Sequence, residues 1–142
     1  MAPAHVLVAL DGSPLSEAAL EYGLETFDCA VTVLNVVTPI ERGMSESGVL
    51  DRDEDRLSDA RERTGAVVAE ARTGTSEERP VETAVETGDP AETILAYVDE
   101  HDVDQVVLGG HGGDSDGLVA RVLGSVATKV VSEAPVTVTV VR

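Results

Sequence analysis

The sequence predicts an α/β fold in which a parallel sheet carries helices on both faces. Short apolar runs alternate with helical patterns along the 142 residues, and such alternation is typical of a parallel sheet. The composition is 42% hydrophobic but includes only one Phe, two Tyr and no Trp. The core must therefore be built from Val, Leu, Ile and Ala, as in strands buried on both faces. We expect one domain over residues 1–142.

The first strand and helix are predicted by a buried run followed by a helix-start signal. Residues 5–10 form a continuous apolar run. Ser13 can cap a helix with Pro14 at its first position, and the helix should reach about residue 27. Its expected apolar face consists of Leu15, Ala18, Ala19 and Tyr22.

A second buried strand, a long loop and an acidic helix follow. Residues 30–37 are expected to form the strand. Residues 38–50 are expected to form a polar loop, which contains one Pro and two Gly. A loop of that length is typical of a lid, a binding loop or a disordered segment. Residues 51–72 are an amphipathic helix. Its apolar face is expected to be Leu57, Ala60, Thr64, Val67, Val68 and Ala71.

The third strand is predicted from a simple alternation of side chains, and the third helix from a clear start signal. Residues 81–87 alternate apolar with polar side chains, which indicates a strand at a sheet edge. Asp89 and Pro90 then supply a cap and a first helical residue, with Glu92 in the first turn. The apolar face of this helix is expected to be Ala91, Ile94, Leu95 and Val98.

The fourth strand, residues 104–108, ends abruptly at Gly109 and Gly110. A polar loop follows, and a last helix begins around Gly124-Ser125. That helix shows apolar positions at helical spacing: Val126, Ala127, Val130, Val131 and Ala134. The final strand, from Val136 to Val141, alternates Val and Thr.

Two strand ends carry residues suited to a ligand. Asp11 and Gly12 follow the first strand, and Gly109 and Gly110 follow the fourth. If these strands are neighbours, in the order 3-2-1-4-5, a crevice lies between them where the strand order reverses. Glycine exposes bare N–H groups, and the first amides of a helix are unpaired and electropositive. These features predict an anion site, most simply for phosphate.

The charge is strongly negative: 27 Asp and Glu face 10 Lys and Arg, for a net charge of -17. Lys129 is the single lysine. Such a surface repels nucleic acids and anionic membranes, and its self-repulsion predicts a salt-loving host, although an ordinary acidic protein is the alternative. No apolar run approaches the roughly 20 residues of a membrane span, and no signal peptide is evident. We expect a cytoplasmic protein with Cys29 as a buried thiol and no intrachain disulfide.

Six short motifs in order resemble the universal stress protein (UspA) family along essentially the whole chain. They are V-A-L-D-G-S, L-N-V-V, G-D-P, V-L-G-G-H-G, L-G-S-V-A and A-P-V-T-V-T-V-V. The resemblance implies a Rossmann-like, doubly wound, five-stranded parallel sheet of order 3-2-1-4-5. It also implies a homodimer, formed through the strand from Val136 to Val141.

The nucleotide-binding branch of that family has a signature of Gly, two residues, Gly, nine residues, then Gly-Ser or Gly-Thr. Here Gly109, Gly112 and Gly124-Ser125 match its anchors, but eleven residues, 113 to 123, stand where the signature has nine. The longer loop holds Asp114 and Asp116, which would oppose a triphosphate unless a divalent cation such as Mg²⁺ bridges them.

The resemblance implies a site for an adenine nucleotide, ATP or AMP. Asp11 with its two preceding residues would face the adenosine, Val36 the adenine, and Leu108 and Gly109 the ribose. The second and third signature glycines and the start of the last helix would meet the phosphates. The full expected set is Ala9, Leu10, Asp11, Val36, Leu108, Gly109, Gly112, Gly124, Ser125 and Val126.

Structural interpretations stay open for several of these residues. Gly109 and Gly112 could be turn glycines, Ser125 a helix cap, and Asp11 an acceptor for its own loop. No metal site is expected, since His111 has no second ligand at ligand spacing. No Walker motif, G-x-S-x-G or nucleophile pair is present.

We therefore expect a nucleotide-binding regulatory or stress-response module with at most slow ATP hydrolysis and no catalytic residues. One alternative is a dimeric stress or adaptor protein that binds no nucleotide. Another is an enzyme of the adenine-nucleotide α-hydrolase type.

Overall fold

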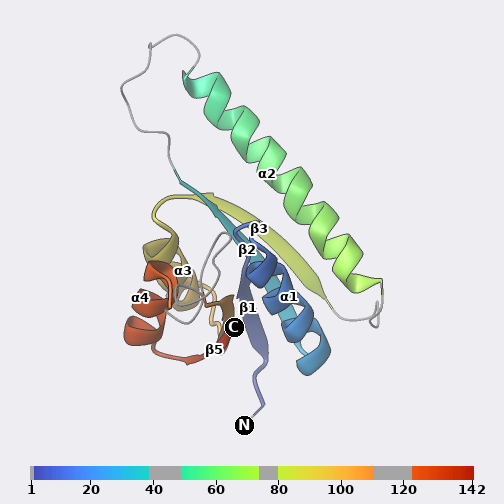
Figure 1. Cartoon of the computed structure of the whole chain (residues 1–142), viewed down its shortest axis with the longest axis vertical. Coiled ribbons are helices and arrows are strands. Elements are labelled where there is room, and N and C mark those ends of the chain that lie inside the picture. The colour runs from blue at the N-terminus through green and yellow to red at the C-terminus, as the bar shows by residue number, and fades with distance from the viewer. Residues whose placement is uncertain (1, 39–48, 74–79, 111–122) are drawn as a thin grey trace.

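A five-stranded parallel sheet forms the centre of the molecule, in the order β3-β2-β1-β4-β5 (Figure 1). The computed structural model describes residues 2–38, 49–73, 80–110 and 123–142. The strands are β1 His5–Ala9, β2 Ala30–Val37, β3 Val81–Thr87, β4 Gln105–Gly109 and β5 Thr137–Val141. The predicted fold and strand order are confirmed, with strand ends within one residue of the expected positions.

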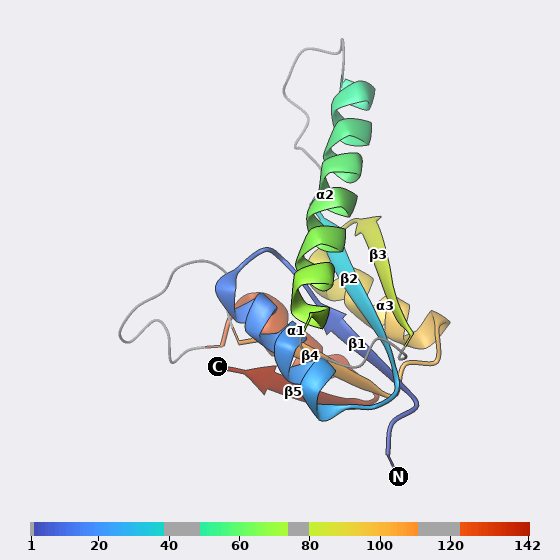
Figure 2. The ribbon, with the colours of Figure 1, turned by 90° about the vertical axis from the view of Figure 1, so that its right-hand side faces the viewer.

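Helices cover both faces of this sheet, two on each (Figure 2). They are α1 Pro14–Thr26, α2 Val49–Arg72, α3 Pro90–Glu100 and α4 Ser125–Glu133. Side chains of β1 alternate between the two cores: Val6 and Val8 pack toward α1 and α2, whereas Leu7 packs toward α3 and α4. All three are fully buried. No helix in the described part of the chain is long and apolar enough to cross a bilayer.

The central position of β1 sets the place of the site. It pairs with β2 on one side, Leu7 facing Thr32, and with β4 on the other, Leu7 facing Val106. The chain reverses its direction of winding at β1, so the carboxyl ends of β1 and β4 lie side by side. The N–H of Leu10 donates to the Leu34 carbonyl at 2.9 Å, which continues the pairing one residue beyond β1.

Local signals fix two of the helix starts as expected. Ser13 caps α1, and its hydroxyl accepts the Ser16 N–H at 3.2 Å. Asp89 caps α3, and its Oδ2 accepts the Glu92 N–H at 3.0 Å. Each helix has Pro at its first position, where a missing N–H costs nothing because that group has no partner within the helix.

Three expectations about helices were wrong. The second helix begins at Val49, not residue 51, so the end of the expected loop 38–50 is helical; residues 39–48 of that loop lie outside the described part. Tyr22 and Val131, expected on buried faces, are 40% and 46% exposed. The buried face of α1 instead contains Ser16 and Gly23.

Small residues explain that shift of the α1 face. A Cβ at Gly23 would lie 3.1 Å from Cγ2 of Val8, so the helix rests close on the sheet along this line. Apolar periodicity marks large side chains, and it overlooks a contact made by a glycine. Cys29, expected to be buried, is half-buried.

Candidate functional site

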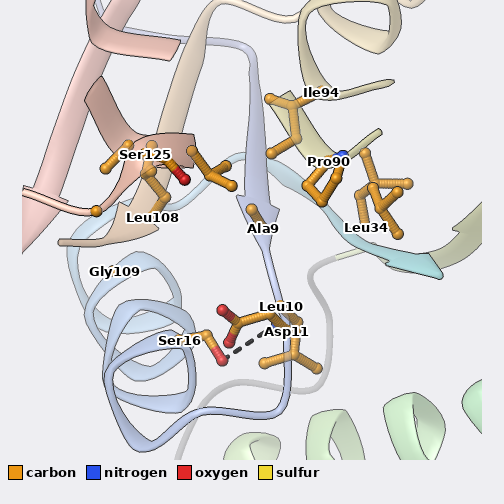
Figure 3. A pocket seen from close by; sticks show the side chains of 14 residues that line it. Ala9, Leu10, Asp11, Ser16, Leu34, Pro90, Ile94, Leu108, Gly109 and Ser125 are labelled. Carbon is orange, nitrogen blue, oxygen red and sulfur yellow. Dashed lines mark hydrogen bonds between the residues drawn. The ribbon is translucent and has the colours of Figure 1, made fainter. Parts of the chain in front are cut away.

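A cavity of about 280 Å³ opens at the carboxyl ends of β1 and β4 (Figure 3). Its walls come from β1 and the loop after it, β2, the first turns of α3, the end of β4 and the start of α4. Of the ten residues expected from the sequence, the nine that the structure describes all line it: Ala9, Leu10, Asp11, Val36, Leu108, Gly109, Gly124, Ser125 and Val126. Gly112 and residues 113–122 of the longer loop lie outside the described residues.

One side of the cavity is an apolar slot, and three of its residues were not among those predicted from the sequence. Leu34 and Ile94 are almost fully buried, and Pro90 lies beside them. Leu34 stands two residues before Val36 on β2, hence on the same face of the strand. Ile94 stands four residues after Pro90, hence on the same face of α3. For Leu34 a sequence signal was available, because it is the period-two neighbour of the predicted Val36; Ile94 had none, because Pro90 was not a predicted site residue.

The opposite end of the cavity is the start of α4. Its N-cap is Gly124, with no side-chain cap bond, and the first helical hydrogen bond runs from Thr128 N–H to the Gly124 carbonyl at 2.9 Å. No described residue accepts the N–H groups of the first three helical residues, and all three residues line the cavity. They are Ser125, Val126 and Ala127. An unpaired helix N-terminus attracts anions.

Two roles differ from expectation at this helix. Gly124 was expected to offer its N–H to phosphate, but that group donates to the Gly110 carbonyl at 2.6 Å. Ser125 was open to interpretation as the cap, but it is the first helical residue and is exposed. Its side chain is turned toward the cavity (Figure 3). The hydroxyl therefore remains available to a ligand.

Asp11 serves its own loop and also lines the cavity. Its Oδ1 accepts the Ser13 N–H at 2.8 Å, and its own N–H donates to Ser16 Oγ at 3.2 Å. Between these residues Gly12 has a φ of +86°, a conformation that glycine adopts without strain. The two interpretations of Asp11 are thus compatible.

Gly109 has a packing role as well as a place in the cavity wall. A Cβ there would lie 3.0 Å from both the carbonyl carbon and Cβ of Leu15. The first turn of α1 therefore packs directly on the end of β4. Beyond it, the Gly110 N–H donates to the Val141 carbonyl at 2.8 Å, which holds β4 to β5.

Attraction of an anion to this cavity would depend on backbone amides rather than on basic side chains. None of its described lining residues is Lys or Arg. Lys129, one turn into α4, has its Nζ 3.5 Å from Oε1 of Glu92. No group of three or more His, Cys, Asp or Glu side chains suited to a metal occurs within the described ranges.

Comparison with known proteins agrees with this architecture. The model of the universal stress protein family matches residues 4–142. The chain belongs to the universal stress protein family. No curated protein matches its sequence. Universal stress protein UspA from Lactobacillus plantarum is 27% identical in sequence to this chain and superposes on it with a TM-score of 0.77. The match covers 100% of this chain and 99% of the UspA chain.

Two further structural neighbours of this universal stress protein hold nucleotides. A family protein from Arabidopsis thaliana with AMP bound is 22% identical, with coverage of 98% of this chain and 91% of its own and a TM-score of 0.56. The protein from Archaeoglobus fulgidus in complex with dAMP is 20% identical, with full coverage of both chains and a TM-score of 0.61. At these identities the likeness shows a shared fold.

Proposed function

We propose that this universal stress protein binds an adenine nucleotide in the cavity between β1 and β4 and acts as a dimeric regulatory module. One observation carries the proposal: a single cavity is lined by an apolar slot, a carboxylate and three amides that no described residue accepts. These three features suit a base, a ribose and a phosphate, respectively. The AMP and dAMP complexes of the two family neighbours support the same ligand class.

Each part of the nucleotide has a physical reason for its place. Leu34, Val36 and Ile94 would pack against the flat faces of adenine, whose burial they favour. Asp11 would accept hydrogen bonds from ribose hydroxyls. The start of α4 would receive phosphate, because its amides and the helix dipole both stabilise negative charge.

The charge of the site favours AMP as the first ligand to test. The cavity offers amides and a hydroxyl but no basic side chain among its described lining, and Asp11 adds negative charge. A monophosphate needs fewer positive partners than a triphosphate, for which a divalent cation would have to compensate. ATP with Mg²⁺ is therefore the second ligand.

The test is calorimetry and thermal unfolding of the wild-type chain in molar salt, with AMP, ATP with and without Mg²⁺, adenosine and inorganic phosphate. A ligand present at 100 times its dissociation constant should stabilise the fold by about 2.7 kcal/mol. AMP should bind more tightly than adenosine or phosphate alone, since it fills both ends of the cavity. The absence of heat and of any shift with all nucleotides would favour the adaptor alternative.

The edge of the sheet supports the dimeric part of the proposal. β5 pairs with β4 on one side, and the sequence T-V-T-V-V gives it no charged residue to discourage a second strand. Sedimentation in molar salt should therefore give twice the chain mass of 14.8 kDa. A single-chain mass at micromolar concentration would contradict the dimer but leave nucleotide binding untouched.

A further inference from the structure

We propose that Ser16 is a positioning residue that holds Asp11 toward the cavity and so controls recognition of the ligand's hydroxyl groups. The inference rests on the proposed nucleotide binding and deepens it. It assigns to the first turn of α1 a role in ligand recognition as well as in helix formation. The carrying observation is the hydrogen bond between Ser16 and Asp11 (Figure 3), together with the bonds that each of them makes to Ser13.

Ser16 is the centre of that network. It is 3% exposed and lies on the first turn of α1. Its Oγ donates to the Ser13 carbonyl at 2.8 Å and accepts the Asp11 N–H at 3.2 Å. Its one donor and one of its two acceptor positions are thus used within the loop that joins β1 to α1.

The same network fixes the Asp11 side chain. Its Oδ1 accepts the Ser13 N–H at 2.8 Å, so the residue is held at both its main chain and its carboxylate. Within the described residues, Oδ2 accepts no hydrogen bond. A carboxylate with one oxygen anchored and the other open at a cavity wall is suited to accept hydrogen bonds from hydroxyl groups.

The arrangement differs from an ordinary helix start. In a capping box, Glu or Gln at the third helical position takes the N–H of the capping residue. Here Asp11 takes the N–H of Ser13, and the third helical residue, Ser16, takes the N–H of Asp11 instead. The polar groups of the turn therefore converge on Asp11, the residue beside the cavity.

A purely structural role for Ser16 makes a different prediction from a positioning role. If Ser16 acts through Asp11, its loss should weaken only those ligands that Asp11 recognises. If Ser16 merely stabilises α1, its loss should weaken all ligands alike. AMP and 2′,3′-dideoxy-AMP separate the two cases, because they share base and phosphate and differ in the ribose hydroxyls.

The experiment measures both ligands by calorimetry in molar salt on the full chain. Wild type should prefer AMP over the dideoxy compound, and Ser16→Ala should lose about tenfold in AMP affinity with less than a twofold change for the dideoxy compound. Asp11→Ala should show the same pattern. The double variant should be no weaker than Asp11→Ala, and Ser16→Thr, which keeps the hydroxyl, should restore the preference.

Several outcomes would overturn the proposal. They are an equal loss for both ligands in Ser16→Ala, no loss at all, or additive losses in the double variant. If Ser16→Ala does not fold, Ser16→Cys, which keeps the volume and weakens the hydrogen bonds, gives the same comparison. If the wild type binds both ligands equally, this inference alone is contradicted. If it binds neither ligand, the proposed function is contradicted as well.

Discussion

At the end of β4, the missing side chain of Gly109 lets the first turn of α1 lie directly on the strand. The same residue forms part of the cavity wall. A glycine at this position thus has a packing reason that would hold in a protein of this fold without any ligand. Its presence in a nucleotide-binding signature is therefore weak support for binding by itself, and the bare amides of α4 are the stronger support.

We expect Gly109→Ala to lower the free energy of unfolding by about 1–3 kcal/mol, because the new methyl group meets backbone of Leu15 that has little freedom to move. Urea unfolding in molar salt measures this. Gly65→Ala is the matched control: an added Cβ there has no neighbour within 4 Å, and the residue is exposed within α2. It should stabilise the chain by about 0.5–1 kcal/mol. Equal effects at the two positions would contradict the packing argument.

Tyr97 gives a pH prediction at the same scale. Burial raises the pKa of its phenol, Glu82 and Glu86 raise this pKa further, and a hydrogen bond with Thr32 partly opposes them. The unfolded chain therefore loses this proton at lower pH than the folded chain. The resulting stability is fully present below about pH 10 and is lost as the pH rises through the folded value.

The free energy of unfolding, followed from pH 8 upward, should thus fall more steeply in wild type than in Tyr97→Phe. Tyr22→Phe is the control, since Tyr22 is 40% exposed. It should keep the wild-type slope. Parallel curves for wild type and Tyr97→Phe would show that Tyr97 does not contribute to the loss of stability at alkaline pH.

Among the elements, helix starts were predictable where a capping side chain is followed directly by proline. Ser13-Pro14 and Asp89-Pro90 open α1 and α3 as their local chemistry predicts. The start of α4 was located, and Ser125 was offered as its cap, but the structure assigns the cap to Gly124. Serine is a common cap, so the sequence favoured Ser125 although the preceding glycine can also adopt the extended backbone of a cap.

The candidate site was predictable to the extent that strand order determines it. Placing β1 beside β4 brings Asp11 and Gly109 together without any knowledge of side-chain packing. Of the missed residues, Leu34 could have been inferred from the strand period that it shares with Val36. Ile94 reaches the cavity through the packing of α3 on the sheet, a tertiary contact that no local pattern contains.

The amide at the first position of α4 can be tested apart from the hydroxyl. Ser125→Pro removes both, yet Pro is well tolerated at a first helical position, and the preceding Gly124 already has a ψ of 165°, which Pro favours in the residue before it. Ser125→Ala removes the hydroxyl alone. If phosphate binds here, AMP affinity should fall about tenfold or more further in the proline variant than in the alanine variant.

Thermal unfolding without ligand checks that both variants of Ser125 keep the fold. Calorimetry with adenosine, which lacks phosphate, should show no difference between them. Equal AMP affinities in the two variants would remove the first amide of α4 from the proposed phosphate contact.

For the molecule as a whole, net charge is the dominant feature. A net charge of -17 is spread over the chain, and Lys129–Glu92 is an ion pair on its surface. Because 27 Asp and Glu face only 10 Lys and Arg, pairing cannot neutralise most of the acidic side chains. Screening shortens from a Debye length of about 10 Å at 0.1 M salt to about 3 Å at 1 M, so dissolved ions must do what basic residues do in less acidic proteins.

We expect the free energy of unfolding to rise steadily between 0.1 and 2 M KCl. Urea unfolding at each concentration measures it. Sucrose is the control for general exclusion effects, because it stabilises compact states without screening charge. Stability that responds to sucrose but not to salt would argue against a salt-adapted surface.

The bare start of α4 has one more consequence. In α1 a serine hydroxyl accepts an N–H of the first turn, whereas in α4 the cap is glycine and no described residue accepts the first three N–H groups. A bound phosphate would then be the missing end of the helix, and its departure would loosen the turn. Since α4 is followed by the edge strand β5, the nucleotide concentration in the cell would then change the stability of the surface proposed for the dimer.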